Sequence, residues 1–263
     1  MVEKDKPLAV DATHSILGIK VAVTSLPAAV DRVIQLSGES HGGYVCAANV
    51  HMSMEAYDDE DFRATVNNAA LVVPDGRPLM WWLKTFCCKE AQQVRGPDLF
   101  ISVAEAASEA GIPVALYGGA AQALEKLKKY LVERFPGLLI ACAISPPYRP
   151  LSVDEDRTYT EVLNASGARI LFVGLGCPKQ EKWMESHKSN LDMAMLGVGA
   201  AFDFYSGEKS LAPSWMSKAG LEWFHRLLSD PRRLWRRYLK TNPRFAYLYL
   251  KELVQEHVAT RSH

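Results

Sequence analysis

The segment 169–183, RILFVGLGCPKQEKW, combines residue types that suit the binding of a phosphate or diphosphate. Its apolar run Ile170–Val173 predicts a buried strand, the glycines after it predict a tight turn, and Pro178 predicts the start of a helix. A helix start carries free backbone N–H groups and a partial positive charge, which attract anions. An ordinary strand-to-helix connection has the same pattern, so the glycines alone leave both interpretations open. The groups that would contact the anion are Gly174, Gly176, Lys179 and Gln180.

The glycine spacing argues against two common nucleotide sites. The pair Gly174 and Gly176 is followed by Lys179 where the dinucleotide fingerprint needs a third glycine, and the pair at 197 and 199 fails in the same way. The sequence also lacks the Gly-Lys-Ser or Gly-Lys-Thr of a P-loop. We therefore expect neither an NAD site nor a P-loop, and no cofactor.

Asp75 is the leading candidate for a catalytic group because it directly follows a predicted buried strand. It lies in LVVPDGRP (71–78), after the apolar residues Leu71–Val73 and before a turn-forming glycine. A carboxylate in that position suits a general base. The alternative role is that of a turn residue that caps the next helix.

Other polar residues follow further predicted strands and would share the same edge of a parallel sheet. Asn49 and His51 could orient a substrate, although each could equally satisfy backbone groups. Gly118 ends another strand, and Asp203 follows the apolar run 193–198 with a weaker case for facing a pocket. The acidic triplets 59–61 and 154–156 have the Asp-x-Asp spacing of many metal-dependent sugar-nucleotide enzymes, but they precede helices, where acids stabilise the helix start. We expect no metal site.

The charge of the chain is balanced overall but uneven along its length. Lys plus Arg number 30, as do Asp plus Glu, yet between residues 223 and 245 the only acid is Asp230. Basic residues and aromatic residues alternate there, which fits a solvated helical face, nucleic-acid binding or contact with an anionic membrane surface. The absence of a nucleic-acid-binding signature favours the membrane over nucleic acid. The arginines expected to contact an anionic lipid are Arg226, Arg232, Arg233, Arg236 and Arg237.

Short apolar runs alternate with helical patterns through the first 200 residues. We therefore expect a Rossmann-like α/β fold, a mainly parallel sheet with helices on both faces, which binds ligands at the carboxyl ends of its strands. Strands are predicted at 44–48, 71–73, 113–117, 138–143, 170–173 and 193–198. Helices are predicted at 53–68, 98–110, 120–135, 153–165 and 178–188, with an additional strand and helix at 16–24 and 26–36.

The pattern changes after Gly207, where strand-like runs stop and Trp, Arg and Tyr dominate. We divide the chain into a Rossmann-like domain, residues 1–211, and a helical membrane-associating appendage, residues 212–263. Pro231 and Pro243 would divide the appendage into helices at 220–228, 232–240 and 244–256. No stretch reaches the roughly 18–20 apolar residues of a membrane span, and the N-terminus has no hydrophobic signal core. We expect a cytoplasmic protein whose C-terminal helices contact a membrane surface peripherally.

Seven segments together resemble the WecG/TagA/CpsF family of bacterial glycosyltransferases, glycosyltransferase family 26. The resemblance covers the chain from about Ile16 to about Phe245. The order and spacing of the segments argue against chance similarity, and CPKQEKW and PDG are the most specific. The segments are AANVHM (47–52), LVVPDGRPLMWW (71–82), VRGPDL (94–99), LYGG (116–119), ILFVGLGCPKQEKW (170–183), GVGAAFDFYSG (197–207) and GLEWFHRLLSDPRRLWRRY (220–238).

The resemblance implies an inverting transfer of a sugar from a UDP-sugar to a polyprenyl-diphosphate-linked saccharide at the cytoplasmic membrane face, without metal or cofactor. Asp75 matches the family's general base, which would take the proton of the acceptor hydroxyl. Gln180 matches a pocket residue of the family, and Asn49 matches the Asn of its Thr-x-Asn element. The helix start after Gly176 and arginines of the appendage would stabilise the leaving UDP.

Two positions depart from the family's pattern. Ala47 replaces the family's Thr, and Gln93 replaces an Arg whose charge Arg95 could supply two residues further on. Since both changes could reflect a different donor sugar, N-acetylmannosamine, glucose and related hexoses all stay open. A second function also stays open, that of a non-catalytic protein that binds nucleotide sugars or lipids. The sequence does not fix the acceptor saccharide or the oligomeric state.

Overall fold

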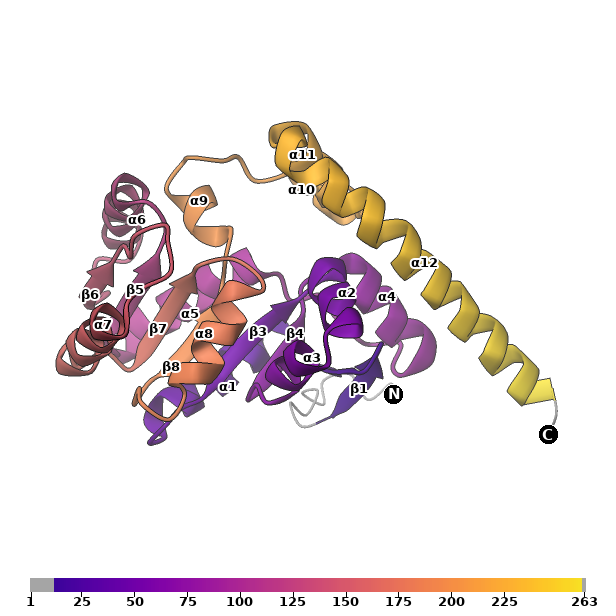
Figure 1. Ribbon diagram of the computed structural model, residues 1–263, viewed down its shortest axis with the longest axis horizontal. Helices are drawn as coiled ribbons and strands as arrows, with labels where there is room; N and C mark the ends of the chain where they lie inside the picture. The colour runs from indigo at the N-terminus through magenta and orange to yellow at the C-terminus, as the bar shows by residue number, and fades with distance from the viewer. Residues whose placement is uncertain (1–11, 262–263) are drawn as a thin grey trace, which may run out of the picture.

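The computed structural model describes residues 12–261, and a six-stranded sheet lies at its centre with all of its strands parallel (Figure 1). The strand order is β4-β3-β8-β7-β5-β6. The strands are β3 Tyr44–Ala48, β4 Leu71–Pro74, β5 Val114–Gly118, β6 Ile140–Ile144, β7 Ile170–Gly174 and β8 Ala194–Gly197. The predicted Rossmann-like α/β fold is confirmed, and every predicted strand of this sheet forms.

Helices cover both faces of the sheet because successive strand residues point to opposite sides. In β3, Tyr44 and Cys46 belong to one core cluster and Val45 belongs to the other. The first face is covered by α2 Val50–Asp58, α3 Glu60–Asn67, α4 Arg77–Phe86, α7 Val153–Ala165 and α8 Lys179–His187. The second face is covered by α1 Leu26–Gly38, α5 Gly96–Ala110, α6 Ala121–Arg134 and α9 Ala201–Tyr205. Burial of both faces explains why the strands are unbroken apolar runs in the sequence.

The N-terminal segment differs from the prediction of one strand over residues 16–24. It forms an antiparallel hairpin of β1 Thr13–Ile16 and β2 Ile19–Ala22. Both turn residues, Leu17 and Gly18, have positive φ, as a type I′ hairpin turn requires. The short turn escaped prediction because Leu17 is not a residue that usually favours this conformation.

The predicted helix 53–68 was also wrong in detail, because the structure divides it into α2 and α3. Asp59 ends the first helix and begins the second: its side chain accepts a hydrogen bond of 2.9 Å from the N–H of Phe62. A side-chain oxygen that satisfies a free N–H of a first turn favours a new helix start. The acids 59–61 thus lie at a helix N-terminus.

The C-terminal residues form α10 Ser214–Lys218, α11 Glu222–Ser229 and the long helix α12 Pro231–Arg261 (Figure 1). The predicted break at Pro243 is wrong, because α12 continues through it. Proline inside a helix costs a hydrogen bond, but α12 is packed on both sides of this residue. Leu234 and Phe245 are each only 4% exposed, and Arg244 forms an ion pair of 2.6 Å with Asp58 of α2.

Aromatic rings dock the second half of α12 on α4. The ring of Trp82 lies 5.6 Å from that of Phe245 and 5.5 Å from that of Tyr249, measured between centroids. Beyond these contacts the last turns of α12 extend past the other elements (Figure 1).

Within residues 12–261, no helix is long and apolar enough to cross a membrane.

Candidate functional site

The loops predicted to bind a ligand follow parallel strands, so they lie together at the carboxyl edge of the sheet. Asn49 follows β3, Asp75 follows β4, and the glycines 118 and 174 end the neighbouring strands β5 and β7. Gly118 and Gly174 are paired in register. This edge is therefore the candidate site, with Asp75 at one side and the β5–β7 pair at the other.

Asp75 is partly buried and held by its neighbours. Its Oδ1 accepts a hydrogen bond of 2.7 Å from the N–H of Gly96, and its Oδ2 accepts one of 3.4 Å from the Asn49 side chain. The Gln93 amide donates a hydrogen bond to the Asp75 carbonyl oxygen. The N-cap residue of α4 is Gly76, and no side chain makes a capping hydrogen bond there. The Asp75 side chain therefore does not cap this helix, which was its alternative role.

Burial raises the pKa of Asp75 above its ordinary value, which makes the carboxylate a stronger base. The nearby positive charge of Arg226 lowers this pKa, and the negative charge of Glu222 raises it. Both of these residues belong to α11. The C-terminal helices thus contribute to the electrostatics of a carboxylate that is positioned by residues 12–211, the part of the chain built on the six-stranded sheet and called the sheet domain below.

The turn between β7 and α8 is closed by the side chain of Gln180. Gln180 Oε1 accepts a hydrogen bond of 3.1 Å from the N–H of Gly176, and its Nε2 donates one of 2.7 Å to Glu181 Oε1. Gly197 makes room for this side chain, because a Cβ there would lie 2.8 Å from Gln180 Nε2. The N–H of Gly176, predicted to contact an anion, has an internal partner in this structure.

Sequence reasoning missed Glu181. Its side chain is 0% exposed, and burial raises its pKa to about 7. Its neighbours in the segment, Lys179 and Gln180, received roles because they stand in the predicted first turn. The charge of Glu181 gave no signal, because an acid near a helix start is ordinary.

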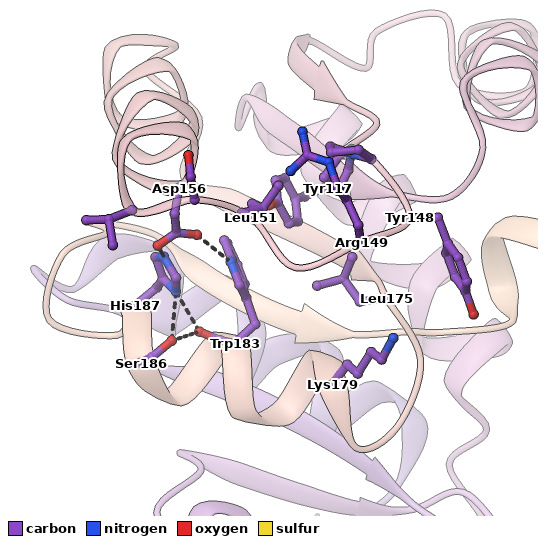
Figure 2. Close-up of a pocket in the computed structure, with 14 residues that line it drawn as sticks. Tyr117, Tyr148, Arg149, Leu151, Asp156, Leu175, Lys179, Trp183, Ser186 and His187 are labelled. Atoms are coloured by element: carbon purple, nitrogen blue, oxygen red, sulfur yellow. Dashed lines mark hydrogen bonds and ion pairs between the residues drawn. The ribbon is translucent and has the colours of Figure 1, made fainter.

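A cavity of about 400 Å³ opens beside this turn, between α8 and the loop that precedes α7 (Figure 2). Figure 2 shows Trp183 and His187 projecting from α8 into it. The ring of Trp183 stacks on Tyr117 with centroids 4.5 Å apart and on His187 with centroids 4.1 Å apart. Asp156 of α7 fixes this stack: it accepts a hydrogen bond of 3.4 Å from Trp183 Nε1 and lies 3.0 Å from His187 Nε2.

Of the residues predicted to bind substrate, Lys179 lines this cavity. It is exposed, and its Nζ lies 5.2 Å from the ring centroid of Tyr148, which is fully exposed at the cavity mouth. Sequence reasoning did not identify the pocket. The only available signal was the presence of Tyr117 and Trp183 in two of the quoted segments, LYGG and CPKQEKW.

The remaining predicted residues have polar partners at the same edge or near it. Arg95 lies 3.6 Å from Asp98 and 3.1 Å from Glu222. Asp203 forms an ion pair of 2.6 Å with Lys209. Burial and the charge of Arg237 lower the pKa of His51 to about 4, so its imidazole is neutral at physiological pH.

The predicted arginines of the appendage divide into two groups. Arg226 and Arg237 act on the sheet domain, because their charges shift the pKa values of Asp75 and His51. Arg232 and Arg236 are exposed on α12. The side chain of Arg233 lies outside the described part of the structure.

Comparison with known proteins identifies the chain. The model of the glycosyl transferase WecG/TagA/CpsF family matches residues 14–259. The chain belongs to this family. An N-acetylglucosaminyldiphosphoundecaprenol N-acetyl-β-D-mannosaminyltransferase from Bacillus spizizenii is 29% identical over 214 residues, which cover 81% of this chain and 80% of the relative. The protein of the same name from Bacillus subtilis is 26% identical over 212 residues, 80% of each chain.

Ala47 and Gln93, the two positions expected from the resemblance to depart from the family's pattern, both lie beside Asp75. Gln93 donates to the Asp75 backbone, and Ala47 lies beside Gly96, whose N–H holds the carboxylate: a Cβ on Gly96 would lie 3.5 Å from the Ala47 methyl group. Both positions therefore lie beside the candidate base.

Among the described residues, no group of three or more His, Cys, Asp and Glu side chains is placed to hold a metal ion.

Proposed function

We propose that this glycosyltransferase transfers a hexose from a UDP-sugar to a polyprenyl-diphosphate-linked saccharide in the synthesis of a cell-surface polysaccharide. The names of the two Bacillus relatives make N-acetylmannosamine the first donor sugar to test, and undecaprenyl-diphosphate-linked N-acetylglucosamine the first acceptor. Glucose and related hexoses come next, because Ala47 and Gln93 change the surroundings of the candidate base.

The geometry of Asp75 carries this proposal. A carboxylate with a raised pKa, held by the Gly96 N–H and the Asn49 amide, is suited to accept a proton at a fixed place. In the proposed step the acceptor hydroxyl oxygen forms a bond to the anomeric carbon while the bond from that carbon to UDP breaks. The hydroxyl proton passes to Asp75, and UDP leaves with the bonding electrons. A single displacement of this kind inverts the anomeric configuration.

The strand order suggests how the donor lies across the edge. Asp75 follows β4, and the aromatic cavity lies by β7, three strands away, and β5, four strands away. At a spacing of about 4.8 Å per strand, this is about 14–19 Å, enough room for an extended nucleotide sugar. We place the uracil ring against Tyr148 or the Tyr117–Trp183 stack, since bases stack on aromatic rings. The diphosphate would lie near Lys179, and the sugar would point toward Asp75.

Charged groups of the protein would take the place of a metal in this proposal. Lys179 stands at the start of α8, and Arg226 reaches the surroundings of Asp75 from α11. Cations and helix N-termini stabilise a leaving diphosphate. We therefore propose transfer without a divalent ion.

The outer surface of the C-terminal helices fits an acceptor that sits in a membrane. Large apolar side chains are exposed there together with arginines, a combination that binds anionic lipid surfaces. We propose that this surface holds the protein peripherally at the membrane. The exposed residues are Trp215, Trp223, Phe224, Leu228, Trp235, Leu239, Tyr247, Leu250, Val254 and Val258.

The test is a transfer assay with a panel of UDP-sugars and a short-chain lipid-diphosphate N-acetylglucosamine, in the presence of EDTA, read by mass spectrometry. We expect an extended product with the wild-type chain. Asp75→Asn should lower the rate by about 10²–10⁴-fold while donor binding survives, because an amide oxygen still accepts from Gly96. Wild-type rates from this variant would refute the assigned base. Donor binding without product for any sugar would favour the non-catalytic alternative.

A further inference from the structure

One carboxylate connects the C-terminal helices to the sheet domain beside the candidate base. Glu222 stands at the start of α11, and its side chain is 20% exposed. Its Oε2 lies 3.1 Å from Arg95 Nε, and its Oε1 accepts a hydrogen bond of 2.9 Å from Arg226 Nη2. Because Arg95 precedes α5 and Arg226 belongs to α11, this carboxylate spans the two parts of the chain.

The sheet-domain end of this bridge adjoins the group that holds Asp75. Arg95 is the N-cap residue of α5, and the next residue, Gly96, donates its N–H to the Asp75 carboxylate. A shift of Arg95 therefore moves the turn that positions the candidate base. The neighbouring Gln93 has an uncharged side chain, and its amide donates a hydrogen bond to the Asp75 carbonyl oxygen.

The bridge also decides which charges surround Asp75. The charged groups are Arg226 and Glu222 on α11, with Arg95 and Asp98 at the start of α5 beyond them. Glu222 offsets the positive charge of both arginines. Glu222 is the carboxylate that both guanidinium groups contact, and Arg95 also lies 3.6 Å from Asp98. The Nε atoms of both arginines are buried and make no hydrogen bond within the described part of the chain, so loss of the Glu222 charge would leave both groups less compensated.

We propose that Glu222 is a positioning residue that, through Arg95 and Arg226, holds α11 against the Asp75 site and sets the charge around that carboxylate. Arg95 is its partner across the joint. The docking part of this inference stands on the contacts alone, while its effect on catalysis rests on the proposed function. The two parts are therefore tested by separate measurements.

Other contacts should keep the segment folded when this bridge is weakened. The Arg77 side chain donates a hydrogen bond of 3.0 Å to the Ser217 carbonyl oxygen, which links α4 to α10. Gly220 lies against the ring of Trp81. Because both contacts are independent of Glu222, Glu222→Gln should remove the charge of the bridge without unfolding α10 and α11.

The docking test is hydrogen exchange of the full-length chain, followed over residues 214–229. Arg95→Gln and Glu222→Gln should each speed exchange there about tenfold, and the double variant should add little to either single change, since both remove the same contact. Glu208→Gln is the matched control, because it removes an exposed ion pair with Lys126 and should leave exchange unchanged. Wild-type exchange in both single variants would overturn the docking role.

The catalytic test compares pH profiles of kcat/KM, and it separates the charge effect from simple loosening. Glu222→Gln should lower kcat/KM about tenfold and shift the acid limb to lower pH, because the charge of Arg226 then acts on Asp75 without compensation. Arg95→Gln should shift that limb the other way, because Glu222 is then less compensated. Loosening alone would not produce opposite shifts, so shifts of the same sign or no shifts would overturn this role. Absence of transfer by the wild-type chain would refute the proposed function and leave the exchange result intact.

Discussion

Replacing Gly118 by alanine should push β5 and β7 apart at the edge of the sheet where the candidate site lies. A Cβ on Gly118 would lie 2.6 Å from the carbonyl carbon and oxygen of Gly174. These are backbone atoms of the paired strand, so no side-chain rotation relieves the contact. Gly118 also has φ +123°, a conformation that side chains with a Cβ rarely adopt.

The expected loss has two parts. Overpacking of a well-packed region costs about 1–3 kcal/mol, and a strained backbone conformation costs about 1–3 kcal/mol. Together they predict a loss of about 2–6 kcal/mol in the free energy of unfolding. For a chain of this size, each kcal/mol lowers Tm by about 2–4 °C, so Gly118→Ala should melt about 4–24 °C below wild type.

Gly167→Ala is the matched control for this prediction. Gly167 has φ +74° and no atom within 4 Å of the place where its Cβ would lie, so its replacement adds strain without overpacking. Scanning calorimetry of the two variants then isolates the contact with Gly174. If Gly118→Ala and Gly167→Ala lower Tm equally, the close approach of β5 and β7 does not limit this position, and the argument fails.

Three further changes test other parts of the structure. Burial raises the pKa of Glu181 to about 7 from 4.5, so the folded state binds the proton more tightly than the unfolded state, and stability falls as the pH rises between these values. Glu181→Gln should reduce the drop in Tm between pH 5 and pH 7.5, and an unchanged drop would contradict the raised pKa of Glu181. Pro243→Ala should stabilise the chain by about 1–3 kcal/mol, because the α12 interior regains an N–H; a lower midpoint in denaturant would show that the proline fits α12 better than expected. Tyr148→Ala should weaken UDP binding about tenfold in calorimetry, whereas Tyr247→Ala, at an exposed position on α12, should not. If both variants bind UDP with the same affinity, the aromatic pocket is not part of the donor site.

The sheet could be predicted from the sequence because its signals are local. Strands buried on both faces are unbroken apolar runs, and the helices between them separate these runs clearly. The carboxyl-edge position of Asn49, Asp75 and Gly174 followed from topology once the strands were parallel. Local signals also failed where packing opposed them: Pro243 predicted a helix end, but contacts on both sides hold α12 together.

The sequence by itself determined the family, the α/β fold and the position of Asp75 after a buried strand. Only the tertiary structure decided what surrounds these residues, because the partners come from distant segments. The hydrogen bond from Gly96 to Asp75 joins residues 21 positions apart in the sequence. The contact between Asp156 and His187 joins residues 31 positions apart. Glu222 meets Arg95 only because α11 folds back onto the sheet domain. Burial, hydrogen bonding and the charges that shift a pKa depend on such distances in space, which the order of residues along the chain does not contain.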